Sequence, residues 1–184
     1  MFGEGSQKPH ANDAVELADD LNRSLLNDAF ESSNNSWKAE AYLKKLKESD
    51  PCFDYRIARD ESTGAPTAIV WQTGTMRADF ELYGCQLHLD FMMRKLNSYL
   101  WPYISIVVVD ANGSPRCALE GLACTERSEA YVFAVLALLD MSPGRKNGDI
   151  LVVFADGRLD YTILDAAHMD LPNAKFFSGT SIIY

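Results

Sequence analysis

The sequence predicts an α/β protein built on one mixed β-sheet, and three patterns carry that prediction. Short runs with apolar residues at every second position, such as Phe53, Tyr55 and Ile57, are typical of strands exposed on one face. Longer runs with apolar residues three or four positions apart are typical of amphipathic helices. The continuous apolar run over 150–155 is typical of a parallel strand buried on both faces. Beyond the N-terminal part, the expected order of the main elements is β-β-β-α-β-α-β.

Composition favours one main domain, because 184 residues with 47% hydrophobic content can form one sizeable core. The net charge of -9 argues against a broad phosphate-binding face, so any contact with DNA should be local. The sequence has neither a long apolar run nor a charged-then-apolar leader, which indicates a soluble intracellular protein without a membrane partner. The four cysteines lack CxxC spacing, and we expect reduced, buried thiols.

Residues 1–50 are expected to form a polar tail followed by two helices. The first, over 13–30, has apolar residues at helical spacing, and the second carries Trp37, Tyr42 and Leu43 and ends before Pro51. Residues 51–184 form the main domain, which begins with a β-hairpin whose turn lies at 61–66.

The remaining elements of the main domain follow from periodicity and from turn residues. A short helix stops at Gly84 and leads directly into the central strand, and an Asp-Ala-Asn-Gly turn joins the next two strands. The predicted strands are 85–90, 103–109, 116–124, 150–155 and 174–177, and the predicted helices are 75–83, 128–140 and 158–168.

Two apolar strands each end on a carboxylate, Asp90 and Asp156. The carboxyl ends of parallel strands are where open α/β sheets place their ligands. If the two strands are neighbours, the two side chains can hold a divalent cation, since carboxylate oxygens are the ligands that Mg²⁺ prefers. The alternative for each aspartate taken singly is a helix cap or a turn, where this residue type is common.

The order of elements is that of the ribonuclease H-like fold, with strand order 3-2-1-4-5 and a helical and hairpin extension at the N-terminus. Residues 42–139 also resemble the transposases of Mutator-like elements (MULE transposases) and the FAR1-type proteins domesticated from them. Short motifs in a fixed order carry the resemblance: Asp50-Pro51, Trp71 in the hairpin, Asp90 followed by Arg94-Lys95-Leu96-Asn97, Trp101-Pro102, the turn at 110–113, then Glu126, Glu129, Tyr131 and Phe133, and finally Asp156.

The resemblance implies that Asp90 and Asp156 are the first two members of an Asp-Asp-Glu triad. In that family the triad holds Mg²⁺ or Mn²⁺ for DNA cleavage and strand transfer during transposition and recombination in the nucleus. This sequence departs from the family's Asp-x-Thr-Tyr motif, since Asp90 is followed by Phe91-Met92-Met93, and Ser178-Gly179-Thr180-Ser181 stands in place of Cys-x-x-His. The third acid has no assigned residue, so we expect an inactive catalytic core with weak or absent DNA binding.

Two other readings stay open at this stage. One is a domesticated, non-enzymatic protein with a regulatory or protein-interaction role, and the other is an unrelated α+β protein in which both aspartates are caps. Glu126 is either a substitute ligand or an acid stabilised at a helix N-terminus. His88 is expected to be packed or at the surface and not to be a metal ligand. A sheet face left uncovered would require the N-terminal helix, self-association or a partner protein to cover it.

Overall fold

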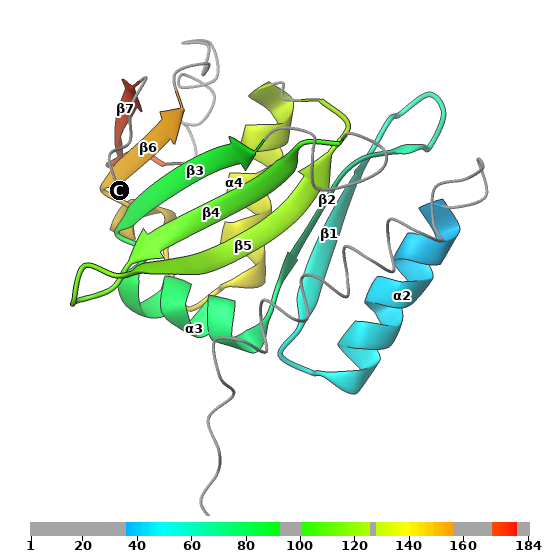
Figure 1. Cartoon of the computed structure of the whole chain (residues 1–184), viewed down its shortest axis with the longest axis horizontal. Helices are drawn as coiled ribbons and strands as arrows, with labels where there is room; N and C mark the ends of the chain where they lie inside the picture. Colours follow the sequence, from blue (N-terminus) through cyan, green and yellow to red (C-terminus); the bar gives the residue numbers. More distant parts are fainter. Residues whose placement is uncertain (1–35, 93–100, 126–127, 157–170, 180–184) are drawn as a thin grey trace, which may run out of the picture.

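The computed structural model describes residues 36–92, 101–125, 128–156 and 171–179. They form a seven-stranded mixed sheet with strand order β1-β2-β5-β4-β3-β6-β7, packed against three α-helices (Figure 1). In chain order the elements are α2 (Ser36–Ser49), β1 (Asp54–Arg59), β2 (Pro66–Gln72), α3 (Gly74–Tyr83), β3 (Gln86–Met92), β4 (Tyr103–Val109), β5 (Pro115–Ala123), α4 (Ser128–Met141), the 3-10 turn η1 (Asn147–Asp149), β6 (Val152–Asp156) and β7 (Lys175–Gly179).

The predicted α/β class with a mixed sheet is confirmed. β1 to β5 pair in antiparallel fashion along the sheet, and β6 and β7 add to β3 as parallel strands. The chain passes from β5 to β6 through α4, as a connection that leads to a parallel pair requires. The predicted helices at 13–30 and 158–168 lie outside the described residues.

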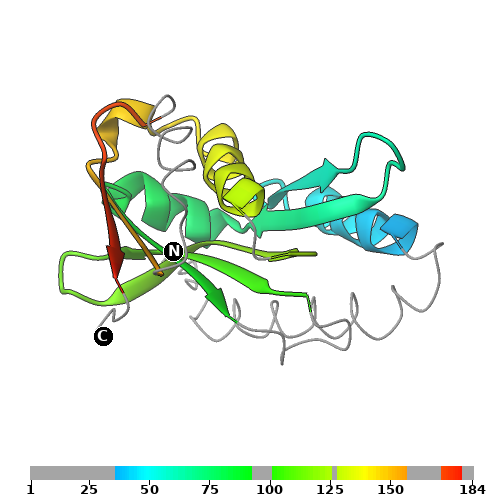
Figure 2. The ribbon, with the colours of Figure 1, turned by 90° about the horizontal axis from the view of Figure 1, so that it is seen from above.

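One face of the sheet carries the main core. Leu87 and Leu89 of β3 and Ile104 and Ile106 of β4 are almost fully buried there. Figure 2 shows α3 and α4 on the same side of the central strands, where α3 lies against β4 and β5 and α4 lies against β1, β2 and β5. The two helices cover this face, so most of its side chains form the core.

The opposite face has a smaller core under α2. Leu43 of α2 is fully buried against Ile69 and Trp71 of β2 and Leu122 of β5. Because side chains alternate along a strand, Ile69 and Trp71 point away from the main core, to which Val70 belongs. α2 therefore covers the β1-β2-β5 end of this second face.

A β-bulge interrupts the pairing of β4 with β5. Ile106 pairs with Leu119 but Val107 pairs with Cys117, so Ala118 is the extra residue. The carbonyl of Ala118 accepts a hydrogen bond from Gln72 Nε2 at 3.0 Å, and Gln72 Oε1 accepts one from Ser142 Oγ at 2.9 Å. Both polar side chains are completely buried, and they tie the bulge to the segment that follows α4.

The prediction of buried cysteines is wrong for three of the four thiols. All four are free, and Cys52, Cys85 and Cys124 are exposed, whereas Cys117 is half-buried. The exposed thiols lie in a turn or just outside a strand end, where the apolar neighbours in sequence do not imply burial. Of the two phenylalanines in β7, Phe176 packs against the main core and Phe177 is 49% exposed.

Candidate functional site

The strands that carry the two predicted acids are neighbours. β3 and β6 run parallel, and their register joins Leu87 to Val153 and Leu89 to Ala155 (Figure 1). Asp90 and Asp156 are the residues that follow the last pair of this register, Leu89 and Ala155, on the two strands. The sequence could not establish this adjacency. The side chain of Asp156 lies outside what the structure describes, so a cation shared by the two carboxylates stays a prediction.

Asp90 does not end its strand, in contrast to the prediction. β3 continues to Met92, because its pairing with β4 extends through Asp90 and Ser105 to Met92 and Tyr103. The described pairing with β6 stops earlier, at Leu89. Asp90 is thus the first residue of β3 after its parallel pairing with β6 ends. Its side chain is half-buried. A cap or turn does not describe this position.

A row of polar residues crosses the second face of the sheet. The registers join Trp71 of β2 to Glu120 of β5, Glu120 to Ser105 of β4, and Ser105 to Asp90 of β3. Alternation places all four on the face opposite the main core, since Leu89 belongs to that core. On β6, Asp156 follows Ala155, and its pairing partner on β7 is Gly179.

Glu120 is the residue of this row that the sequence analysis missed. It is a single acid inside the otherwise apolar stretch 117–123, and that contrast is the signal that could have identified it. Trp71 Nε1 donates a hydrogen bond to Glu120 Oε2 at 3.2 Å. Trp71 is on β2, on one side of Glu120, whereas Asp90 is on β3, two strands away on the other side. Two strand spacings put the backbones of Glu120 and Asp90 about 9.6 Å apart. The hydrogen bond to Trp71 therefore orients the Glu120 carboxylate away from Asp90.

Cys117 is packed beside the row. Burial, to which the charge of Glu120 adds, raises the pKa of the Cys117 thiol well above its usual range. Its Sγ is 3.5 Å from the carbonyl oxygen of Leu119. A thiol held neutral in this way is a poor nucleophile and a poor metal ligand.

His88 lies on the same face as Asp90, two residues earlier in β3. Its Nε2 is 2.6 Å from Gln86 Nε2, and its Nδ1 is buried with no hydrogen-bond partner among the described residues. Burial lowers the pKa of His88, which favours the neutral ring. The ring stacks on Phe154 at 4.9 Å between centroids, and Phe154 stacks on Phe177 at 5.3 Å. His88 is therefore a packed histidine, and its Nε2 is in contact with the Gln86 side chain.

The described side chains contain no group of three or more His, Cys, Asp or Glu residues placed to hold a metal ion. Glu126, the candidate substitute for the third acid, lies outside the described residues. Glu129 is in the first turn of α4 and is exposed. Asp90 contributes the hard oxygen donors that a divalent cation requires, but the structure gives it no third acidic neighbour within the described part of the chain.

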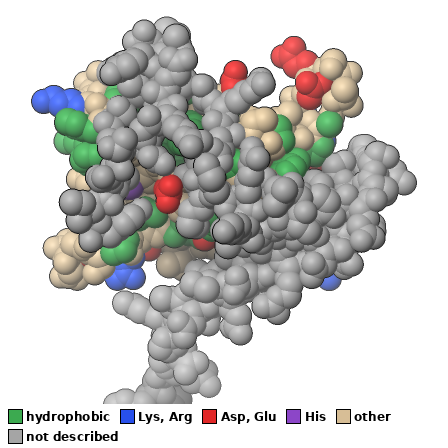
Figure 3. All heavy atoms as spheres, turned by 45° about the horizontal axis from the view of Figure 1, so that its top comes forward, with side chains coloured by type: hydrophobic (Ala, Val, Ile, Leu, Met, Phe, Trp, Pro, Cys, Tyr) green, Lys and Arg blue, Asp and Glu red, His purple; other side chains and the backbone are tan. Residues whose placement is uncertain are grey.

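The surface of the described residues agrees with the acidic composition. On the face shown in Figure 3, Lys and Arg side chains appear only as small separate groups near the margins, and acidic and hydrophobic side chains lie between them. A broad basic patch is thus not seen on the described part of this face. Among the residues searched, none of the helices has the length and apolar content needed to span a membrane.

Comparison of the chain with protein-family models, with characterised proteins and with solved structures gives no match. The site is therefore interpreted from its own residues and from the topology that places them.

Proposed function

We propose that this chain is a ribonuclease H-like core of the Mutator-like transposase lineage, in which Asp90 and Asp156 are two of the acids of a metal site. The observation that carries the proposal is the parallel pairing of β3 with β6, which joins Leu89 to Ala155, the residues just before Asp90 and Asp156. Two aspartates that act only as independent caps do not require their strands to be neighbours.

The strand order supports the fold assignment. Numbered from β3, the five strands β5-β4-β3-β6-β7 read 3-2-1-4-5, with α4 as the crossover between the third and fourth strands. β1 and β2 extend the sheet beyond the third strand as the N-terminal hairpin. A right-handed crossover that returns the chain beside its first strand is the usual way to place two strand ends at one edge.

When bound, two divalent cations would activate a water or a 3'-hydroxyl group and stabilise the leaving oxygen of a phosphodiester. The carboxylates at positions 90 and 156 would hold the metal. Ser105 and Glu120 continue the row on the opposite side of Asp90 from Asp156, and the hydrogen bond to Trp71 keeps the Glu120 carboxylate oriented toward β2.

The proposed state of this chain is a core that binds Mg²⁺ or Mn²⁺ weakly and does not cut DNA. Two carboxylates leave most coordination positions to water, and Mg²⁺ loses its water shell reluctantly. The net charge of -9 adds repulsion for a phosphate backbone. Both features favour, within this lineage, a domesticated protein with a regulatory or protein-interaction role, which is the second candidate function.

Calorimetric titration with Mg²⁺ and Mn²⁺, together with a plasmid-nicking assay, tests the proposal. We expect weak binding that Asp90→Asn abolishes and that Asp149→Asn, an exposed acid in η1, leaves unchanged. Equal binding by both variants would contradict the metal site. Robust nicking that Asp90→Asn abolishes would support the lineage but overturn the inactive state, and Glu126→Gln would then identify the acid that completes the site.

A further inference from the structure

A pocket lies on the other side of the sheet from Asp90. It has a volume of about 250 Å³ and lies between the β1-β2 hairpin, the exit of β5 and the first turns of α4. Because α4 covers the main-core face, this pocket is separate from the polar row. Its lining residues are Ala58, Thr67, Ala68, Cys124, Thr125, Glu129, Ala130 and Phe133.

Small side chains explain why the pocket is open. Three of its walls meet at Ala58 of β1, Ala68 of β2 and Ala130 of α4, and an alanine at each of these positions leaves room that larger core residues would fill. The backbone at the exit of β5 is fixed, since Cys124 N donates to Thr67 O at 2.8 Å. The hollow is thus bounded by two strands and a helix, which are rigid elements.

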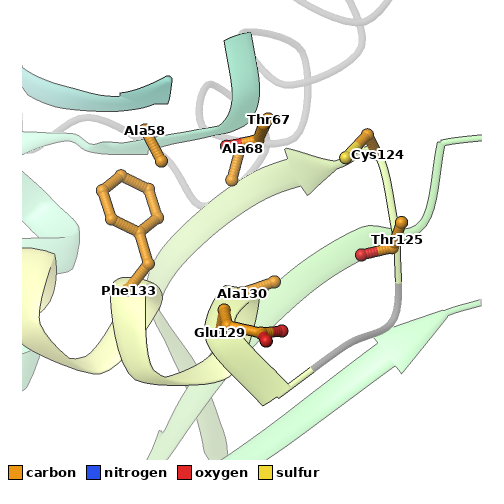
Figure 4. A pocket seen from close by; sticks show the side chains of 8 residues that line it. All are labelled: Ala58, Thr67, Ala68, Cys124, Thr125, Glu129, Ala130 and Phe133. Atoms are coloured by element: carbon orange, nitrogen blue, oxygen red, sulfur yellow. The ribbon is translucent and has the colours of Figure 1, made fainter. Parts of the chain in front are cut away.

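The lining has an apolar end and a polar end. Figure 4 shows the ring of Phe133 directed toward Ala58 at one end, with Cys124 and Thr125 at the other and the carboxylate of Glu129 turned toward them. Glu129 is the one carboxylate in the lining, and the lining contains neither lysine nor arginine. A hydrocarbon body fits the alanine and phenylalanine walls, and a cation complements the carboxylate.

We propose that this pocket binds a small organic cation, a primary amine on a compact hydrocarbon or aromatic body. The aromatic ring of Phe133, at the apolar end, packs against the hydrocarbon or aromatic body of the ligand, while the ammonium group lies toward Glu129. The hydroxyl groups of Thr67 and Thr125 are available acceptors for the remaining N–H donors. The volume is below the range of about 300 to 1,000 Å³ typical of drug-sized ligands, so the ligand is about the size of one amino-acid side chain.

Benzylamine is the probe, with benzyl alcohol and benzoate as neutral and anionic partners of the same shape. Titration of the full chain at neutral pH and low salt, followed by amide chemical shifts in NMR spectra, should give a dissociation constant on the order of millimolar for benzylamine. We expect binding at least about fivefold weaker for benzyl alcohol and weaker again for benzoate. Equal affinity for all three probes, or absence of any binding, overturns the proposal.

Two variants assign the binding to this pocket. Glu129→Gln should weaken benzylamine about fivefold and leave benzyl alcohol unchanged, whereas Glu61→Gln, in the exposed hairpin turn, should change neither. Ala58→Leu should fill the pocket and abolish binding of both probes. An effect of Glu129→Gln that is no larger than that of Glu61→Gln would show that the carboxylate is not the recognition group.

The reaction rates of the exposed cysteines test the same proposal in the unmutated protein, so this test does not require that a variant folds. Cys124 lines the pocket, and Cys52 and Cys85 are free exposed thiols elsewhere in the chain. Saturating benzylamine should slow the reaction of Cys124 with N-ethylmaleimide about twofold or more and leave Cys52 and Cys85 unaffected, as measured by peptide mass spectrometry. If benzylamine leaves the reaction rates of all three thiols unchanged, the ligand binds elsewhere and the proposed site is wrong.

Discussion

Removing the hydroxyl group of Ser142 should destabilise the protein far more than its size suggests. Ser142 and Gln72 are both completely buried, and Ser142 Oγ donates to Gln72 Oε1 at 2.9 Å. Ser142→Ala leaves that amide oxygen buried without this donor, and an unsatisfied buried acceptor costs about 1 to 3 kcal/mol. For a chain of this size, a loss of about 2 kcal/mol lowers the melting temperature by roughly 4 to 8 °C.

Urea unfolding followed by circular dichroism measures this loss as a lower midpoint with an unchanged m-value. The matched control is Ser49→Ala, which removes an exposed hydrogen bond from Ser49 Oγ to Leu46 O and should cost no more than about 0.5 kcal/mol. A double-mutant cycle with Gln72→Met should show coupling, because the pair forms one network. If Ser142→Ala and Ser49→Ala cost the same, the buried bond does not hold the bulge in place and the reasoning fails.

Two further predictions follow from the turns and strands around the site. Gly121→Ala should destabilise the protein by about 1 to 3 kcal/mol in urea unfolding, because an added Cβ would lie 2.5 Å from the backbone oxygen of Ile69 in the neighbouring strand; a neutral effect would show that β2 and β5 can separate. Asp110 has a pKa lowered from 3.8, chiefly by the backbone N–H of Ser114, with the Arg116 guanidinium also contributing. Its stabilising contribution is present above about pH 3.8 and is lost as pH falls through the lower folded pKa. Asp110→Asn should therefore reduce the acid-side slope of stability against pH, and an unchanged slope would assign that slope to other carboxylates.

Local sequence patterns predicted most elements of the described part of the chain and its α/β class. Alternation, helical periodicity and turn residues are local properties, and they predicted α2, α3, α4 and all seven strands to within a few residues. The turn at 110–113 illustrates why: Asp110 Oδ1 accepts from the backbone N–H of Asn112 and of Ser114, bonds that need only neighbouring residues. The sequence left open whether His88 is packed or at the surface, and its stacking on Phe154 is seen only in the structure.

Which strands lie side by side could be read only from the folded chain. β4, β5 and α4 separate β3 from β6 along the chain, and no local pattern specifies that these two strands pair. The register that joins Leu89 to Ala155, one residue before Asp90 and Asp156, therefore became visible only in the sheet. Glu120 entered the polar row for the same reason, through two antiparallel registers. The exposure of Cys52, Cys85 and Cys124 and the pocket beside Glu129 likewise depend on where strand ends and α4 meet in space. Sequence sets local conformation through short-range hydrogen bonds and periodicity, whereas long-range pairing sets which side chains face one another.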